Sequence, residues 1–433
     1  MAKERAEDRR GSYRANDPLR HLWLPYTQMQ TAPPPLAVAG TEGVRIVLED
    51  GRELIDAVSS WWTACHGYNH PHIRNKVSEQ LAAMPHVMMG GMVNEPAIQL
   101  AERLAALLPG DLDHVFFSES GSVSVEIAMK MAVQVWLNRG VAGRTKFIGF
   151  RHGYHGDTAM AMSVTDPEDG MHQAFDGFVP RQIIADLPRN EAGMAEFDRL
   201  LAAEKDRVAA VIMEPLVQCA GGMKMHGADT LAAIAECCRR HGVLLILDEI
   251  ATAFGRTGSL FACDQAGIVP DIITLSKSLT GGTMALAATV ASREVYESFL
   301  SDDPEKALMH GPTFTGNPLA CAAANASLDL FESESRLEQV AAIETHLKKA
   351  LAPCRGLPGV VDVRIKGAIG AVQLEPPLDT AALRERFVER GIWLRPFGDV
   401  VYTMPPFIVS QNELSAITDA MVEVVTEWSA EHG

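Results

Sequence analysis

Asp248 and Lys277 are the residues of this chain best placed to do chemistry, because each follows an apolar run. Asp248 comes after residues 243–247, and Lys277 lies 29 positions later (277 − 248), shortly after residues 272–275. Pyridoxal phosphate needs such a pair, since a lysine binds its aldehyde as a Schiff base while an acidic side chain pairs with its pyridine nitrogen. Both predicted strands end where open α/β sheets bind ligands. The pair therefore predicts a pyridoxal-phosphate site.

Two other interpretations of this pair are simpler. Lys277 could be an ordinary surface lysine and Asp248 a helix cap, or residues 243–249 could be the Walker-B strand of an ATPase. The second requires a G-x-x-x-x-G-K-[ST] loop to hold phosphates. The chain contains no such pattern, and Ser276-Lys277-Ser278 lacks its glycines. The missing loop argues against an ATPase.

A phosphate could bind where a predicted strand meets a helix, at Ser118-Glu119-Ser120-Gly121-Ser122. Free backbone N–H groups and the helix dipole attract an anion at such a start without any basic side chain. The helix is indicated by apolar residues at helical spacing, namely Ile127, Ala128, Met131, Ala132 and Val135. A serine cap would explain one serine, but not the whole segment.

Other segments carry candidate ligand contacts. Tyr154 lies between glycines and could stack on a flat ring. Arg395 lies among apolar residues and needs an anionic partner, which could be a substrate carboxylate or an internal acid. Residues 310–318 are rich in turns and offer threonine hydroxyls, and Trp61-Trp62 could be core or ligand wall.

Histidines raise the question of a metal site. His152 and His155 form one group, and His66, His70 and His72 form another. Neither group has the acidic partner or the helical spacing of known zinc motifs. The sequence patterns therefore predict no metal.

Composition limits the class of protein. The 433 residues are 47% hydrophobic and 21% charged, as in globular proteins, and the formal net charge of −17 argues against binding to nucleic acids. Seven cysteines without a C-x-x-C pair are typical of a reduced, cytoplasmic compartment. Residues 1–10 lack an apolar signal core, and no apolar run approaches the ~20 residues that span a bilayer.

Alternating short apolar strands and helical patterns predict how these residues are positioned. From about residue 70 to 325 they indicate an α/β fold with a mainly parallel sheet covered on both faces. The expected strands are 114–117, 146–150, 209–213, 243–247, 272–275 and 287–291. A hairpin is expected around Asp50-Gly51. A long helix is expected near 321–350, before strands 360–365 and 370–374 and a helix near 380–390, in a second, smaller α+β domain.

Taken together, these segments resemble the class III pyridoxal-phosphate aminotransferases, which have fold type I. The resemblance extends from about Tyr26 to Phe407. It rests on Ser59-Ser60-Trp61-Trp62, His66-Gly67-Tyr68-Asn69-His70-Pro71, Ser120-Gly121-Ser122, Gly153-Tyr154-His155-Gly156-Asp157-Thr158, Asp248-Glu249-Ile250-Ala251-Thr252, Leu279-Thr280-Gly281-Gly282-Thr283-Met284 and Arg395-Pro396-Phe397-Gly398. It implies a large cofactor-binding domain over 66–328 and a smaller domain built from 1–65 and 329–433.

The resemblance also implies roles for single residues. Lys277 would form the Schiff base, Asp248 would pair with the pyridine nitrogen, and Tyr154 would contact the cofactor and take part in catalysis. Gly121 and Ser122 would hold the phosphate. The segment Gly311, Pro312 and Thr313 would reach the cofactor phosphate of a neighbouring subunit, which implies a homodimer. Substrates would be contacted by Tyr26, Trp61, Tyr154, Lys277, Gly311 and Arg395, with Asp157 and Arg256 shaping the same pocket.

One departure from the broader class narrows the expected substrates. Members that act on ω-amino acids commonly carry a glutamate in the loop after a Glu-Pro pair, but the loop here, 214–222, lacks that acid. The resemblance is therefore to the branch in biotin biosynthesis, which implies transamination of 8-amino-7-oxononanoate with S-adenosylmethionine as amino donor. Lysine as donor, an ω-amino-acid or polyamine aminotransferase, and a catalytically inactive regulator remain alternatives.

Overall fold

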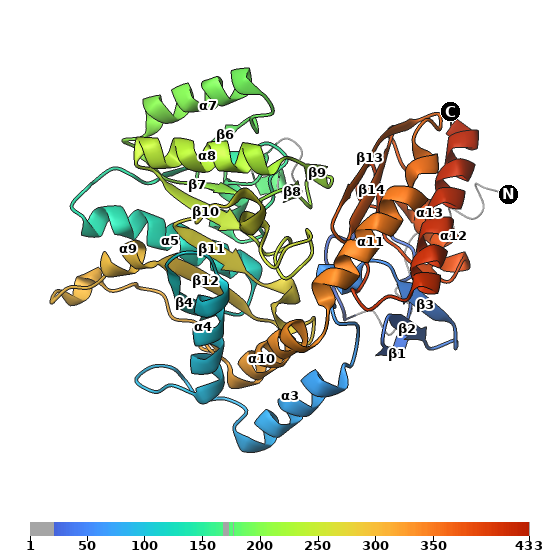
Figure 1. The fold of residues 1–433 in the computed structure, drawn as a ribbon, viewed down its shortest axis with the longest axis horizontal. Coiled ribbons are helices and arrows are strands. Elements are labelled where there is room, and N and C mark those ends of the chain that lie inside the picture. The colour runs from blue at the N-terminus through green and yellow to red at the C-terminus, as the bar shows by residue number, and fades with distance from the viewer. Residues whose placement is uncertain (1–20, 168–172, 176, 433) are drawn as a thin grey trace.

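The computed structural model describes residues 21–167, 173–175 and 177–432. Two parts lie side by side: in the larger, helices surround a central sheet, and in the smaller, the blue N-terminal strands lie beside the orange-to-red C-terminal helices (Figure 1). Within the described ranges, no helix is both long and apolar enough to cross a bilayer. The expectation for the charged residues 1–10 falls outside the residues described.

Seven strands form the central sheet, in the order β4-β12-β11-β10-β7-β5-β6. β12 is antiparallel to both its neighbours, and the other pairs are parallel. The predicted α/β fold with a mainly parallel sheet is confirmed. The strands are β4 (Leu112–Ser118), β5 (Lys146–Phe150), β6 (Ile183–Ala185), β7 (Val208–Met213), β10 (Leu244–Asp248), β11 (Ile272–Leu275) and β12 (Ala287–Ser292). Only β6 was not predicted, because three residues carry too short a pattern.

Both faces of this sheet are buried, and alternate residues of β10 point to opposite faces. Leu244 and Ile246 belong to the apolar cluster that contains α5 (Gly121–Asn138). Leu245 and Leu247 belong to the cluster that contains α7 (Glu191–Glu204) and α8 (Ala228–His241). Burial on both faces explains why the sequence shows continuous apolar runs rather than an alternating pattern.

The other helices of the larger part pack around this sheet. Among them, α3 and α4 pack against α10. They and the short elements nearby are α3 (Pro71–Ala83), α4 (Glu95–Leu107), α6 (Ala159–Ser163), β8 (Val217–Gln218), β9 (Lys224–Met225), α9 (Arg293–Glu297) and α10 (Pro318–Ser333).

The smaller part is built from both ends of the chain. β15 (Ile392–Trp393) pairs in parallel with β3 (Glu53–Asp56) and so completes the N-terminal sheet, β1-β2-β3-β15. β2 and β3 form the hairpin predicted around Asp50-Gly51. The remaining elements are β1 (Val38–Glu42), β2 (Arg45–Leu48), α2 (Ser59–Trp62), α11 (Arg336–Ala350), α12 (Thr380–Glu389) and α13 (Gln411–His432), with a second sheet of β13 (Val360–Lys366), β14 (Ile369–Leu374) and β16 (Val400–Thr403).

The prediction of one long helix over 321–350 is wrong. α10 ends at Ser333 and α11 begins at Arg336, because Glu334 between them has extended backbone angles. The buried guanidinium of Arg336 pairs with Glu334 and donates to Nδ1 of His66, so tertiary contacts fix the break. Since α10 packs with the larger part and α11 with the smaller, we propose this break as the domain boundary in place of 328/329.

Candidate active site

Asp248 and Lys277 line one cavity of about 200 Å³, at the edge of the sheet where β10 and β11 end. The register of these two parallel strands places Asp248 beside Thr274. Lys277 follows shortly after as the first residue of a 3₁₀ helix, Lys277–Thr280. Three further residues expected at the site also line the cavity, namely Gly121, Ser122 and Tyr154.

Hydrogen bonds hold the carboxylate of Asp248 from several sides. Its Oδ2 lies 2.7 Å from Nδ1 of His155, and both side chains are buried. Its Oδ1 accepts from the backbone N–H of Ile250 at 3.1 Å and from the hydroxyl of Thr274 at 3.4 Å. A buried carboxylate with this many donors is stabilised in one orientation.

Lys277 lies in a strained backbone conformation, with φ of 42°. A residue other than glycine keeps such an angle only where its surroundings impose it. Its Nζ lies 4.7 Å from the centre of the Trp62 ring, and Trp62 is in turn held by a hydrogen bond from Nε1 to the hydroxyl of Tyr402. Burial lowers the pKa of Lys277, although Cys219, Asp248 and Glu214 act in the opposite direction. The amine therefore loses its proton more readily than a solvated lysine.

The start of α5 also lines the cavity. Ser120 caps the helix by accepting the N–H of Val123, so Gly121 and Ser122 stand at its N-terminus. A Cβ on Gly121 would lie 2.9 Å from a methyl group of Ile250. A Cβ on Gly156, whose φ is +121°, would overlap the hydroxyl of Ser122. Glycines here keep backbone N–H groups and the helix end open to an anion.

Tyr26, Tyr154 and Asp157 form a hydrogen-bonded group next to the cavity. Both phenols donate to Oδ1 of Asp157, at 2.5 Å from Tyr26 and 2.7 Å from Tyr154, and the two phenol oxygens lie 3.3 Å apart. Burial is the main reason that the pKa of Tyr26 rises to about 12, and it raises the pKa of Tyr154 as well. Both phenols stay protonated near neutral pH.

Trp61 and Arg395 extend this group toward solvent. The rings of Tyr26 and Trp61 meet edge to face with centroids 6.2 Å apart, and the guanidinium carbon of Arg395 lies 5.1 Å from the centre of the Trp61 ring. Trp61 is 44% exposed and does not line the central cavity itself. These side chains are available to a ligand that extends outward from the cavity.

Both tryptophans are carried by a left-handed turn, α2, in which all four residues of Ser59–Trp62 have positive φ angles. Such a conformation costs about 1–2 kcal/mol per residue. Buried Asp56 holds the turn by accepting the N–H groups of Val58 and Ser60 at 2.9 and 2.7 Å. Without this carboxylate, the two tryptophans would lose their support.

Arg256 is not brought into the cavity. Its side chain is fully buried, and its guanidinium donates to the carbonyls of Ala368 and Pro405 and to the hydroxyl of Ser59. Those contacts engage Nη1 and Nη2 inside the protein, so Arg256 supports the turn of Ser59–Trp62 rather than facing a ligand directly.

Gly311, Pro312 and Thr313 also lie away from the cavity of their own chain. Gly311 and Thr313 are exposed, between the exposed side chains of Met309 and Phe314. Phe314 packs against the ring of His86, and Met88, Met92 and Val93, which follow His86 in the chain, are exposed.

Of the cavity-lining residues that were not among the predicted site residues, Trp62, His155 and Glu214 contact predicted ones. From the sequence, His155 was weighed as a metal ligand, and the Trp61-Trp62 pair as core or ligand wall. Glu214 accepts the N–H groups of Cys219 and Tyr154, and burial raises its pKa to about 7. The Glu214-Pro215 pair in the sequence was the signal that could have drawn attention to it.

Comparison with known proteins gives a consistent family. The sequence model for aminotransferase class III matches residues 26–425. The adenosylmethionine-8-amino-7-oxononanoate aminotransferase of Mycobacterium leprae is 45% identical over 93% of this chain and 94% of its own length. The protein of that name from Saccharomyces cerevisiae is 34% identical over 95% of each chain.

Solved structures of aminotransferases are also similar to this chain. The adenosylmethionine-8-amino-7-oxononanoate aminotransferase of Methanocaldococcus jannaschii superposes with a TM-score of 0.91 at 36% identity, over 94% of this chain and 97% of that one. An (S)-enantioselective ω-transaminase from Thermomicrobium roseum gives a TM-score of 0.87 at 30% identity, over 98% of each chain. The fold, the family match and the relatives converge: this chain belongs to the class III aminotransferases.

Proposed function

We propose that this chain is a pyridoxal-phosphate-dependent aminotransferase that converts 8-amino-7-oxononanoate to 7,8-diaminononanoate in biotin biosynthesis, with S-adenosylmethionine as amino donor. The observation that carries the proposal is that Asp248 and Lys277 line one cavity at the ends of neighbouring strands. The choice of substrates is supported by relatives of 40–45% identity that carry this activity in their names.

The residues around the cavity fit pyridoxal phosphate. Lys277 offers an amine for the aldehyde, Asp248 a buried carboxylate for the pyridine nitrogen, and Gly121 and Ser122 the N-terminus of a helix for the phosphate. When bound, the cofactor supplies an electron sink and carries the amino group between the two halves of a ping-pong reaction.

The protein residues supply proton transfer and charge. With its pKa lowered by burial, Lys277 serves as the general base that takes the proton from Cα of the amino donor. Asp248 brings its carboxylate to the cavity, and His155 keeps that carboxylate in place. Trp62 packs beside Nζ of Lys277 and limits the access of water to it.

The group of Tyr26, Trp61, Asp157 and Arg395 provides recognition of two unlike substrates. Aromatic faces suit both an alkyl chain and a cationic sulfonium. The carboxylate of Asp157 attracts positive charge, while the guanidinium of Arg395 provides a partner for the distal carboxylate of the acceptor.

We also propose that two copies of this chain form the functional unit. Gly311 and Thr313 are exposed, between the exposed apolar side chains of Met309 and Phe314. An apolar surface of this kind marks a protein–protein contact. In a homodimer it would be covered, and residues 311–313 would reach the phosphate site of the partner.

A panel of amino donors tests the reaction. The purified holoenzyme is supplied with 8-amino-7-oxononanoate and either S-adenosylmethionine, lysine, a polyamine or an ω-amino acid, and 7,8-diaminononanoate is measured by mass spectrometry. Formation with S-adenosylmethionine supports the proposal, whereas formation with lysine alone would assign the other donor. Turnover of polyamines or ω-amino acids with pyruvate, but none of 8-amino-7-oxononanoate with any donor, would overturn it and favour the activity of the ω-transaminase neighbours.

A further inference from the structure

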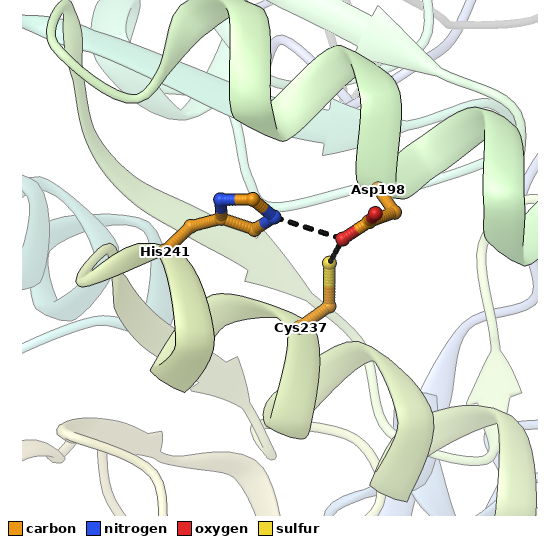
Figure 2. Close-up of side chains that lie close together, drawn as sticks. All are labelled: Asp198, Cys237 and His241. Carbon is orange, nitrogen blue, oxygen red and sulfur yellow. Dashed lines mark hydrogen bonds and ion pairs between the residues drawn. The ribbon is translucent and has the colours of Figure 1, made fainter.

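We propose that α7 and α8 form a zinc site, separate from the active-site cavity, with Asp198, Cys237 and His241 as its protein ligands. Figure 2 shows the three side chains converging in the space between the two helices. Oδ1 of Asp198 lies 2.8 Å from Nε2 of His241 and 3.3 Å from Sγ of Cys237. One atom from each residue could therefore reach a single ion.

The positions of the ligands follow from helix geometry. Cys237 and His241 are four residues apart on α8, so their side chains lie on the same face, and that face is turned toward Asp198 on α7. The required residues are far apart in sequence, which is why no zinc motif was visible in the sequence. Packing of the two helices brings them together.

The distances suit a tetrahedral zinc ion. Bonds of ~2.3 Å to sulfur and ~2.0 Å to nitrogen and oxygen imply distances of about 3.5 Å between S and O ligands and about 3.3 Å between N and O ligands. The corresponding distances here are 3.3 and 2.8 Å. Widening these two distances by about 0.2 and 0.5 Å would match the tetrahedral geometry, and the ligand atoms of Cys237 and His241 lie within 4.8 Å of each other.

The chemical type of the three ligands indicates which metal ion would bind, and the exposure of their side chains indicates what would complete its coordination. A thiolate favours zinc over magnesium or calcium, which prefer oxygen ligands. Cys237 is buried, whereas the side chains of His241 and Asp198 are 16% and 37% exposed. The fourth position thus faces solvent and would take a water molecule. On binding, Cys237 would release its Sγ proton to solvent, and His241 would bind through Nε2 with its proton on Nδ1.

Arg240 competes for this site. Its Nη2 lies 2.9 Å from the same Oδ1 of Asp198, and its side chain is about half exposed. Zinc would displace this guanidinium into solvent. An Arg240→Ala variant should therefore bind zinc more tightly than the wild type, and unchanged affinity in that variant would count against Asp198 as a ligand.

Metal analysis of the holoenzyme tests the site. The protein is treated with a chelator, dialysed against micromolar zinc chloride, and its bound zinc is measured by mass spectrometry. The wild type should hold one more zinc per chain than Cys237→Ser or His241→Ala, and its unfolding midpoint should rise with zinc, because a ligand that binds the folded state stabilises it. Cys238→Ser and His432→Ala serve as matched controls, since neither residue belongs to the cluster, and both should retain the zinc.

Cobalt chloride gives a second measurement. Cobalt bound through Cys237 should produce visible absorption bands that disappear in Cys237→Ser and remain in Cys238→Ser. Aminotransferase activity reports whether each variant is folded. Equal zinc content in the wild type, Cys237→Ser and His241→Ala, all active, would overturn the proposal, as would a wild type that retains no zinc.

Discussion

Nδ1 of His155 and Oδ2 of Asp248 lie 2.7 Å apart in the interior of the protein, at the end of the strand that opens onto the active-site cavity. A charged carboxylate at this depth needs partners, and His155 is one of them. The two residues therefore have different roles. Asp248 supplies the carboxylate, and His155 holds that carboxylate in position.

Replacing Asp248 by Asn removes the charge and keeps the shape. We expect weaker retention of pyridoxal phosphate and a fall in turnover of about 100-fold or more, because an electrostatic contact is lost at the reacting group. Absorbance of the bound cofactor after dialysis and the rate of 7,8-diaminononanoate formation measure the two effects. His155→Ala leaves the carboxylate of Asp248 in place, so its turnover should fall less than that of Asp248→Asn. Near-normal turnover of Asp248→Asn would mean that the carboxylate has no electronic role.

Asp56 should be important for activity although it does not line the cavity. It accepts two N–H groups of the left-handed turn that carries Trp61 and Trp62, so Asp56→Ala should leave these N–H groups without their acceptor, at a cost of about 1–3 kcal/mol each, and the turn should no longer be held in its strained form. We expect lower turnover together with a lower unfolding midpoint. Asp50→Ala, which removes an exposed aspartate paired with Arg52, is the control and should change neither.

Local pattern was sufficient to predict the elements that carry the site. Strands 146–150 and 272–275 were predicted at the residues where they occur, because buried parallel strands are apolar throughout. The break between α10 and α11 could not be predicted in this way. It depends on the contact of Arg336 with His66, which lies 270 residues away.

In the candidate site too, local sequence pattern predicted some features, whereas others depend on contacts between residues far apart in the sequence. Asp248 and Lys277 end strong strand patterns, so their meeting follows from the order of a parallel sheet. His155 follows another strand, but nothing in its local sequence indicates that its ring turns toward Asp248. Arg256 was expected at the pocket and instead lies on internal carbonyls, since sequence alone does not show which partner satisfies a buried charge.

Arg395 should discriminate between the two substrates. If its guanidinium holds the distal carboxylate of 8-amino-7-oxononanoate, Arg395→Ala should raise the KM of the acceptor by about tenfold or more and that of the donor much less. Steady-state kinetics with each substrate varied in turn measure both. Arg395→Lys keeps the positive charge but lacks the paired N–H donors of a guanidinium. Its KM for the acceptor should therefore lie between that of the wild type and that of Arg395→Ala. Equal increases in the two KM values would mean that Arg395 only supports Trp61.

Glu249 should make stability fall as pH rises. Burial raises its pKa to about 7, although both oxygens accept backbone N–H groups, from Ala262 and Cys263. The folded state then holds a proton that the unfolded state releases above its ordinary pKa of 4.5. The contribution to stability is complete below about pH 4.5 and is lost as pH rises to about 7, by about 3 kcal/mol in all.

Glu249→Gln imitates the neutral acid and does not titrate, which makes it the natural comparison. The unfolding midpoint of this variant relative to the wild type should therefore increase from pH 5 to pH 8. Thermal unfolding of both proteins across that range measures the difference. A constant difference would show that Glu249 is ionised throughout.

Mixing two inactive variants tests whether residues 311–313 act on the partner subunit. Lys277→Ala lacks the amine, and a Pro312→Gly/Thr313→Ala double variant lacks the proposed phosphate contact. In a mixed dimer, one site would combine Lys277 of the second variant with intact Pro312 and Thr313 of the first, and would be complete. Equal amounts, unfolded and refolded together, should recover about one quarter of wild-type activity, because half of the dimers are mixed and each has one complete site. If Thr313 serves its own chain instead, every site in the mixed dimer lacks one contribution, and no activity returns.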